Sequence, residues 1–482
     1  MSESSSADAQ VVIASLRAQL AQRDEVIEAL LERVTTLEER LGKNSRNSSK
    51  PPSKDDPFTK PPPRSLRGRS GRRPGKQPGA QGYRLEPEVD PDKVEVHTPI
   101  ECGGCGGDLA VAEVIAQQVR QVFELPPVRV EVTEHRAQTL RCGCGYETTA
   151  AFPAAVSAPT CYGPGIAAVA TYLLVRQHVP FARTAEVMAD CFGVRVSTGW
   201  LAGLLPQAQA RLEGFARLTQ EHLKAAPVGH FDETGARVAG RLWWVHVAST
   251  SSLTHYHRAS GRGKDSADLG GVLAGFEGIG IHDGLTSYRG YPLMSGHGLC
   301  NAHHLRELVA LTESHQRQGL THITWPQTMI DLLVQINTAV TTARTQGHSH
   351  LPGEVLTGFT RDYRDVIAQG WQAHPPPPRT GRQGRPRLGT AGSLLRRLDI
   401  YQDDVLRFAT DFRVPFDNNQ AERDIRMIRV QQKISGSWRS ETGADAYLAV
   451  RSYLSTARKQ HHNALNTLQQ LFTGTPWLPS PT

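Results

Sequence analysis

Apolar residues recur along the first 42 residues at alternating steps of three and four positions. Arg23 alone interrupts the series, which is formed by Ile13, Leu16, Leu20, Ile27, Leu30, Val34, Leu37 and Leu41. About four heptads with β-branched or leucine residues at the seam favour a two-stranded coiled coil. We therefore expect self-association through residues 1–42. The alternative is one amphipathic helix folded against its own protein.

A second pattern, short apolar runs that end in polar residues, begins after residue 226. The runs that read as strands are residues 228–234, 241–248, 253–258 and 278–283. Residues 264–276 read as a helix that returns the chain to the last of them, so we expect a mixed sheet. Asp232 and Asp283 stand where two of the strands end, and loops at strand ends commonly carry functional groups.

A third acid, Glu422, falls on a predicted helix that begins near Gln420, capped by Asp417 or Asn418. Cations follow Glu422 along one helix face, at Arg426, Arg429 and Lys433. A separate apolar stripe for packing is formed by Ala421, Ile425 and Ile428. A carboxylate followed by a row of cations suits a DNA phosphate track. The alternative is a surface helix on which Glu422 pairs with Arg426.

The three acids suit phosphodiester chemistry. Two Mg²⁺ ions about 4 Å apart stabilise both the attacking and the leaving oxygen of an in-line displacement, and carboxylates are the ligands that Mg²⁺ takes. We predict that Asp232, Asp283 and Glu422 are catalytic and hold two Mg²⁺ or Mn²⁺ ions. Asp417 is the main rival for the third position, and Glu233 is a rival for the first.

Four segments carry a resemblance to a known family. They are His230-Phe-Asp-Glu-Thr-Gly235, His282-Asp-Gly-Leu-Thr-Ser-Tyr288, Cys300-Asn-Ala-His-His-Leu-Arg306 and Pro415-Phe-Asp-Asn-Asn-Gln-Ala-Glu-Arg-Asp-Ile-Arg426. The sequence resembles the DDE transposases of the insertion sequence sixty-six family over nearly its whole length. The resemblance implies an RNase H-like core with an insertion between the second aspartate and the glutamate, which cuts and joins DNA with Mg²⁺. It also implies that Asp232, Asp283 and Glu422 are the metal ligands.

Charge is concentrated in one part of the 482-residue chain. Residues 43–76 hold eleven basic and two acidic side chains, so they carry +9 while the whole chain carries +7. Repeated Pro and Gly with few apolar residues predict a flexible linker over residues 43–95. The excess charge favours contact with DNA phosphate. The arginines that we expect to make it are Arg67, Arg69, Arg72 and Arg73.

Four of the seven cysteines form two close pairs. They are Cys102 with Cys105 and Cys142 with Cys144, separated by an apparent hairpin through residues 119–140. Four thiolates around one Zn²⁺ would stabilise a small module over residues 96–155, and an intracellular setting argues against disulfides. The alternatives are four reduced thiols, or a site in which His135 replaces one cysteine.

Residues 160–222 have a helical pattern. Runs at 166–177 and 181–191 are followed by a turn at Gly193 and a helix opened by Ser197, which is helix-turn-helix spacing. This predicts that residues 197–205 enter a major groove, with Ser197, Thr198 and Trp200 near DNA. A plain helical hairpin with Trp200 buried is the alternative, and the resemblance favours DNA binding.

After Asp283, Cys300 and His303 open another helix, one turn apart. They point the same way and could ligate a metal only with further ligands, so we favour a structural role. Residues 301–412 read as an α-helical insertion that contains a mobile basic loop at 374–392. Residues 413–475 complete the core, with a last helical stretch at 444–471.

The predicted fold is therefore multidomain, of the α+β and α/β type. A coiled coil, a zinc-ribbon-like module and a helix-turn-helix precede an RNase H-like core whose first part is residues 226–300. The expected function is a transposase that cuts transposon ends and joins the 3′-hydroxyl to target DNA. The alternative is a catalytically inactive or purely hydrolytic RNase H-like DNA-binding protein.

Location and partners follow from the same features. Nothing in the sequence resembles a transmembrane span or a cleavable signal peptide, so we expect a cytoplasmic, nucleoid-associated protein without membrane contact. The expected partners are DNA and a second copy of the chain, in a homodimer or a higher oligomer. The resemblance adds small accessory proteins of the same element.

Overall fold

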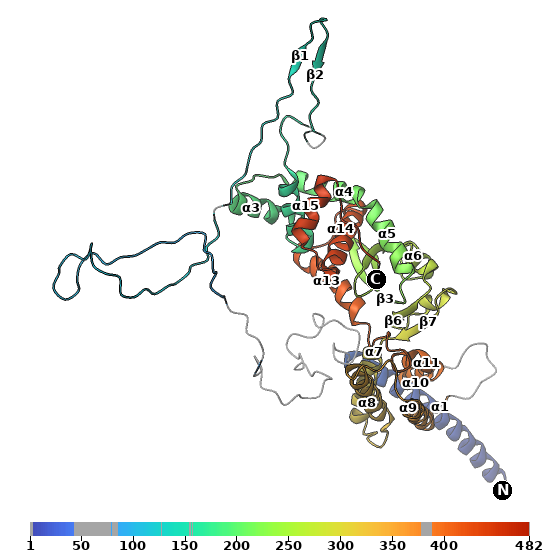
Figure 1. Cartoon of the computed structure of the whole chain (residues 1–482). Coiled ribbons are helices and arrows are strands. Elements are labelled where there is room, and N and C mark those ends of the chain that lie inside the picture. Colours follow the sequence, from blue (N-terminus) through green and yellow to red (C-terminus); the bar gives the residue numbers. More distant parts are fainter. Residues whose placement is uncertain are drawn as a thin grey trace. The chain divides into compact units, whose positions relative to one another are not determined.

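The computed structural model describes residues 3–42, 79, 85–126, 128–153, 156, 158–376 and 388–481. Contacts divide the chain into two units, Met1–Pro62 with Val132–Thr482, and Pro63–Glu131. Most of the predicted linker lies outside the described residues, and so do Arg67, Arg69, Arg72 and Arg73. Figure 1 shows the labelled helices and strands.

A five-stranded mixed sheet forms the centre of the larger unit. Its strands are β3 (Val228–Val238), β4 (Arg241–Ser249), β5 (Thr254–Ala259), β6 (Ile279–His282) and β7 (Gly296–Leu299), in the order β5-β4-β3-β6-β7. β4 is antiparallel to β3 and β5, whereas β6 is parallel to β3 and β7. The mixed sheet is confirmed, and with its helices it is consistent with an RNase H-like core.

Three details of the predicted sheet region were wrong. The first strand does not end near Asp232 but continues to Val238, so Asp232 lies within β3. The helix expected over residues 264–276 is only α6 (Lys264–Asp268), followed by a 3₁₀ turn at Leu273–Gly275. The helix cannot continue through Gly271, whose φ is +66°. Strand β7 was not predicted at all.

Helices cover the β3 to β5 part of the sheet on one face. α13 (Asn419–Ser435) packs on β3 and β4, and α14 (Glu441–Lys459) packs on β5. The predicted stripe of Ala421, Ile425 and Ile428 is buried in this core. The expected single helix over 444–471 is split, because α15 (Ala464–Thr473) starts anew at its Asn463 cap.

The same core includes helices that precede the sheet. They are α2 (Pro164–Thr171) with a π-helical turn at Tyr172–Arg176, α3 (Phe181–Phe192), α4 (Thr198–Arg211) and α5 (Glu213–Lys224). Gly193 ends α3 in the left-handed conformation, and Ser197 caps α4 by accepting a hydrogen bond from Trp200 N at 3.1 Å. The helices and turn of the predicted helix-turn-helix are therefore present.

The insertion between β7 and α13 is α-helical, as predicted. Its helices are α7 (Asn301–Arg317), α8 (Trp325–Thr345), α9 (Gly353–Ala373), α10 (Thr390–Ile400), α11 (Gln402–Val405) and α12 (Arg407–Thr410). Their buried apolar residues form one core with Ile279, Ile281 and Leu299 of β6 and β7. The insertion therefore packs against the β6–β7 side of the sheet. Residues 377–387 of the predicted basic loop lie outside the described residues.

The N-terminal segment is one helix, α1 (Glu3–Leu41). The seam side chains that are described are exposed, at Leu16, Leu20, Ile27, Leu30, Val34, Leu37 and Leu41. Self-association through these side chains, as a coiled coil, stays a prediction. Within the described parts of the chain, no helix combines the length and the apolar composition that a membrane span requires.

The hairpin predicted between the cysteine pairs is not found among residues 119–126 and 128–138. Valines there, such as Val128, Val130 and Val132, are exposed and offer no buried face to a sheet. A shorter hairpin, β1 (Thr139–Arg141) with β2 (Glu147–Thr149), forms instead. Its turn carries Cys142 and Cys144.

Candidate active site

The parallel pairing of β3 and β6 aligns two of the predicted acids. Its register joins Val228 to Ile279 and His230 to Ile281. The observed pairing ends there, and the same register continued by two residues would bring Asp232 of β3 level with Asp283, the residue that follows β6. Neighbouring strands lie about 4.8 Å apart and paired residues point to the same face. We therefore expect the two carboxylates to lie close together, in agreement with the repulsion by Asp283 that raises the pKa of Asp232.

Helix α13 covers this face of β3. His230 and Thr234, which flank Asp232 on that face, both contact the helix. His230 Nδ1 lies 2.9 Å from Asn418 Oδ1, and Thr234 Oγ1 accepts a hydrogen bond from Arg429 Nε at 2.8 Å. Glu422 lies between these two contact points on α13. All three predicted acids therefore belong to the same side of the sheet.

The electrostatics of Asp232 reflect this concentration of acids. Burial raises its pKa well above the ordinary value, and repulsion by Glu233 and Asp283 raises it further. Glu422 adds to the rise, while the hydrogen bond that Asp232 Oδ1 accepts from Glu233 N at 2.9 Å opposes it. A cation between these carboxylates would relieve the repulsion, so the residues present fit a divalent metal.

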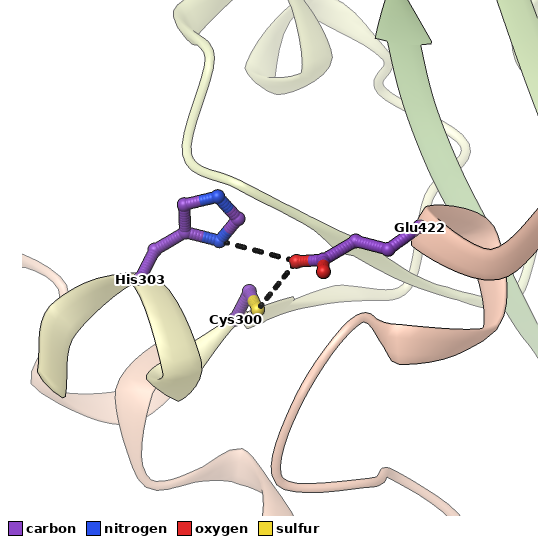
Figure 2. Close-up of side chains that lie close together, drawn as sticks. All are labelled: Cys300, His303 and Glu422. Carbon is purple, nitrogen blue, oxygen red and sulfur yellow. Dashed lines mark hydrogen bonds and ion pairs between the residues drawn. The ribbon is translucent and has the colours of Figure 1, made fainter. Parts of the chain in front are cut away.

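The Glu422 carboxylate is turned toward the start of α7. Figure 2 shows it pointing at Cys300 and His303, with its Oε1 4.0 Å from Cys300 Sγ and 3.7 Å from His303 Nδ1. Arg306 lies 3.7 Å from Oε2. Cys300, His303 and Glu422 are the three side chains in the described structure whose metal-binding atoms all lie within 4.8 Å of one another. The structure thus brings Glu422 closer to Cys300 and His303 than to a shared site with both aspartates.

The two rival acids have other partners. The Glu233 side chain is 1% exposed and lies on the opposite face of β3, where Arg262 Nε donates to it at 2.9 Å and the Tyr288 hydroxyl at 2.7 Å. Asp417 Oδ1 accepts a hydrogen bond from Asn419 N at 3.0 Å and so caps α13. Both carboxylates are occupied by contacts that support the fold.

The hydrogen bonds by which Asn418 joins α13 to β3 were not predicted from the sequence. Its side chain, expected only as a helix cap, donates from Nδ2 to the Phe231 carbonyl at 2.8 Å and meets His230 through Oδ1. Its backbone N–H donates to Cys300 Sγ at 3.2 Å. Asn418 is 1% exposed, and it ties the start of α13 to β3 directly beside Asp232. The Asp-Asn-Asn run was the available signal.

The predicted DNA contacts that are described lie on exposed surfaces. Arg426, Arg429 and Lys433 are exposed on α13, although Arg429 also holds Thr234. Ser197 and Thr198 are exposed at the start of α4. Trp200 is half-buried, with its ring 4.5 Å from that of Tyr162. This packing is closer to the alternative prediction, in which Trp200 is buried, than to an exposed Trp200 near DNA.

Each cysteine pair forms its own tight loop. In the first, Cys102 N donates to Gly107 O and Gly106 N to Cys102 O, both at 2.9 Å. The backbone N–H groups of Cys105 and Gly104 lower the pKa of Cys102, and that of Cys144 lowers the pKa of Cys142. N–H groups aimed at sulfur stabilise a thiolate, the form that binds metal.

The raised pKa of Asp232 leads to a prediction about stability. The folded protein binds this proton more tightly than the unfolded chain, so stability falls as pH rises from the ordinary carboxyl pKa toward the raised one. Without metal at about pH 7.5, Asp232→Asn should therefore melt higher than the wild type, by a few degrees. Differential scanning fluorimetry at about pH 4 should show the gap closing.

With Mg²⁺ present, the wild type should instead melt at a higher temperature than Asp232→Asn. A ligand that binds only the folded state raises the melting temperature, so Mg²⁺ should stabilise the wild type and have little effect on Asp232→Asn. Equal stabilisation of both proteins by Mg²⁺ would argue against a metal at Asp232. An exposed acid at the start of α6 provides the control, because Asp265→Asn should behave as the wild type does.

Comparison with known families agrees with this architecture. Residues 159–446 match the model described as Transposase IS66 family, and residues 99–145 match the zinc-finger binding domain of transposase IS66. Residues 1–86 match a family of unknown function, DUF6444. No curated protein matches the sequence. Because the first match alone covers more than half of the 482 residues, the chain belongs to the IS66 family of DDE transposases.

Proposed function

We propose that this protein cuts DNA at transposon ends and joins the freed 3′-hydroxyl to target DNA, with Asp232, Asp283 and Glu422 as its metal ligands. Membership of the family implies DNA transposition. The observation that supports the assignment of residues is the parallel β3–β6 register, which, continued beyond its paired residues, would bring Asp232 level with Asp283 on the face that α13 covers.

The chain's own residues have distinct roles in this proposal. Asp232 and Asp283 supply closely spaced carboxylates from a rigid sheet, and Glu422 completes the set when it leaves Cys300 and His303. Bound there, Mg²⁺ or Mn²⁺ stabilises the attacking and leaving oxygens of phosphoryl transfer. Asn418 fixes the distance between the sheet and α13, so it is a positioning residue.

DNA binding in the proposal follows the exposed cations. Arg426, Arg429 and Lys433 continue along α13 from Glu422 and would contact phosphates next to the acids. Ser197 and Thr198 at the start of α4 would contact DNA as part of the helix-turn-helix. The basic linker and dimerisation through α1 remain predictions, as do accessory proteins.

We also infer that Cys102, Cys105, Cys142 and Cys144 bind a structural Zn²⁺. The match to the family's zinc-finger domain and the N–H groups directed at sulfur in each loop support this. Four thiolates form a closed structural site. Its role would be to stabilise a module that has few buried side chains of its own.

Loss of one loop's cysteines should remove this metal. In Cys142→Ser, elemental analysis of the full chain should show about one equivalent of zinc less than in the wild type, and residues 99–145 should become protease-sensitive. Cys191→Ser is the matched control, because Cys191 is an exposed cysteine on α3. Unchanged zinc in Cys142→Ser would contradict the four-cysteine site.

A strand-transfer assay tests the proposed function. Labelled DNA carrying the transposon ends is incubated with the full chain and Mg²⁺, and products are separated on a denaturing gel. Joined products are the expected result. Cleavage without joining would identify a hydrolytic nuclease, and binding without cleavage would identify an inactive DNA-binding protein.

A further inference from the structure

Cys300, His303 and Glu422 have the geometry of an incomplete metal site. Cys300 is the N-cap of α7 and His303 lies on its first turn, so a Cys-x-x-His pair faces the carboxylate from α13. Donor atoms around tetrahedral Zn²⁺ lie about 3.3–3.5 Å apart, given its bond lengths. The observed separations of 3.7 Å and 4.0 Å would have to contract by only about 0.5 Å.

One of these atoms lacks a hydrogen-bond partner in the described structure. His303 Nδ1 is buried and forms no hydrogen bond, because 3.7 Å from Glu422 Oε1 is too long. The contact between the Cys300 thiol and Glu422 is also long, at 4.0 Å. Cys300 Sγ does accept a hydrogen bond from Asn418 N at 3.2 Å. Buried polar atoms rarely remain without partners, so an unpartnered His303 Nδ1 beside a thiol and a carboxylate suggests a ligand.

The donor set selects the class of cation. A thiolate and an imidazole favour borderline or soft metals such as Zn²⁺, whereas Mg²⁺ takes oxygen. Arg306 lies 3.7 Å from the Glu422 carboxylate and opposes a cation. This repulsion, and a set of only three protein ligands, weaken binding, which makes this a reversible site rather than a structural one.

We propose that Cys300, His303 and Glu422 form a reversible site for a thiophilic divalent cation such as Zn²⁺, and that filling it withholds Glu422 from catalysis. The second half rests on the proposed function, because it assigns Glu422 to the magnesium centre. One carboxylate then serves two alternative sites. Zn²⁺ would inhibit DNA cleavage by competing for Glu422, and DNA-bound protein with Mg²⁺ in place would resist it.

Cobalt spectroscopy tests the site without using activity. The full chain, with its zinc module loaded with one equivalent of Zn²⁺, is titrated with Co²⁺. We expect one further equivalent to bind, with the sulfur-to-cobalt charge-transfer band and the strong visible bands of four-coordinate Co²⁺. Cys300→Ala should lose the charge-transfer band, and His303→Gln should bind at least about tenfold more weakly. Asp283→Asn should bind Co²⁺ as the wild type does.

Each outcome has a defined meaning. Only weak six-coordinate bands, or a charge-transfer band that persists in Cys300→Ala, would overturn the proposal. If Cys300→Ala does not fold, Glu422→Gln and His303→Gln decide the question, since both change partly exposed side chains. Cobalt binding by a wild type that cannot cleave DNA in Mg²⁺ would refute the proposed function alone. Cleavage without cobalt binding would refute the second site alone.

Discussion

Glu422→Gln should lower DNA cleavage and strand transfer by at least about a thousandfold while leaving binding to transposon ends unchanged. The substitution keeps the size of the side chain but removes the charge that would hold a metal. It also leaves Ala421, Ile425 and Ile428 packed in the core, so α13 should stay in place. Single-turnover cleavage of labelled DNA in Mg²⁺ measures the loss, and a gel-shift titration measures binding.

A matched glutamate controls for removal of one charge. Glu441 starts α14 and lies 3.1 Å from Arg258, away from the aligned aspartates, so Glu441→Gln should cleave DNA normally. Normal cleavage by Glu422→Gln would show that the third ligand is misassigned. Asp417→Asn would then be the next variant to test, because Asp417 stands just before the same helix.

Asn418→Ala should slow cleavage by about a hundredfold, because displacement of a catalytic group by about 1 Å has effects of this size. The change removes the hydrogen bond to the Phe231 carbonyl and the contact with His230. It leaves a buried carbonyl without its donor, which costs about 1–3 kcal/mol of the free energy of unfolding. Cleavage is to be measured well below the melting temperature of the variant.

The Mg²⁺ dependence of cleavage separates positioning from stability. If Asn418 positions Glu422, the half-maximal Mg²⁺ concentration should rise in Asn418→Ala and rise less in Asn418→Asp, which keeps the oxygen that faces His230. Asn419→Ala is the control, since Asn419 is exposed and its side chain contacts Asp417. If the half-maximal Mg²⁺ concentration were unchanged and only the melting temperature fell, Asn418 would contribute to stability and not to the position of Glu422.

The sequence was sufficient for those parts of the site that depend on local pattern. Short apolar runs located β3 and β6 and the position of Asp283 directly after β6, but not the length of β3, which continues past Asp232 to Val238. The spacing of Ala421, Ile425 and Ile428 located α13. These patterns are local consequences of burying one face of a strand or helix.

The remaining features depend on contacts between distant segments. β7 consists of Gly-His-Gly-Leu, which has low strand propensity and forms a strand only beside β6. Gly270 packs directly against His257 of β5, a contact that leaves no room for a side chain at position 270. Asn418 and Phe231 are 187 residues apart, and no local pattern predicts such a pair. The contact of Glu422 with Cys300 and His303 has the same long-range character.

The most direct test of the metal centre is anomalous scattering from crystals of the full chain with transposon-end DNA and Mn²⁺. We expect two manganese peaks about 4 Å apart, held by Asp232, Asp283 and Glu422. Glu422 should then have left Cys300 and His303. Cleavage-competent crystals whose manganese avoids Asp232 and Asp283 would contradict the account.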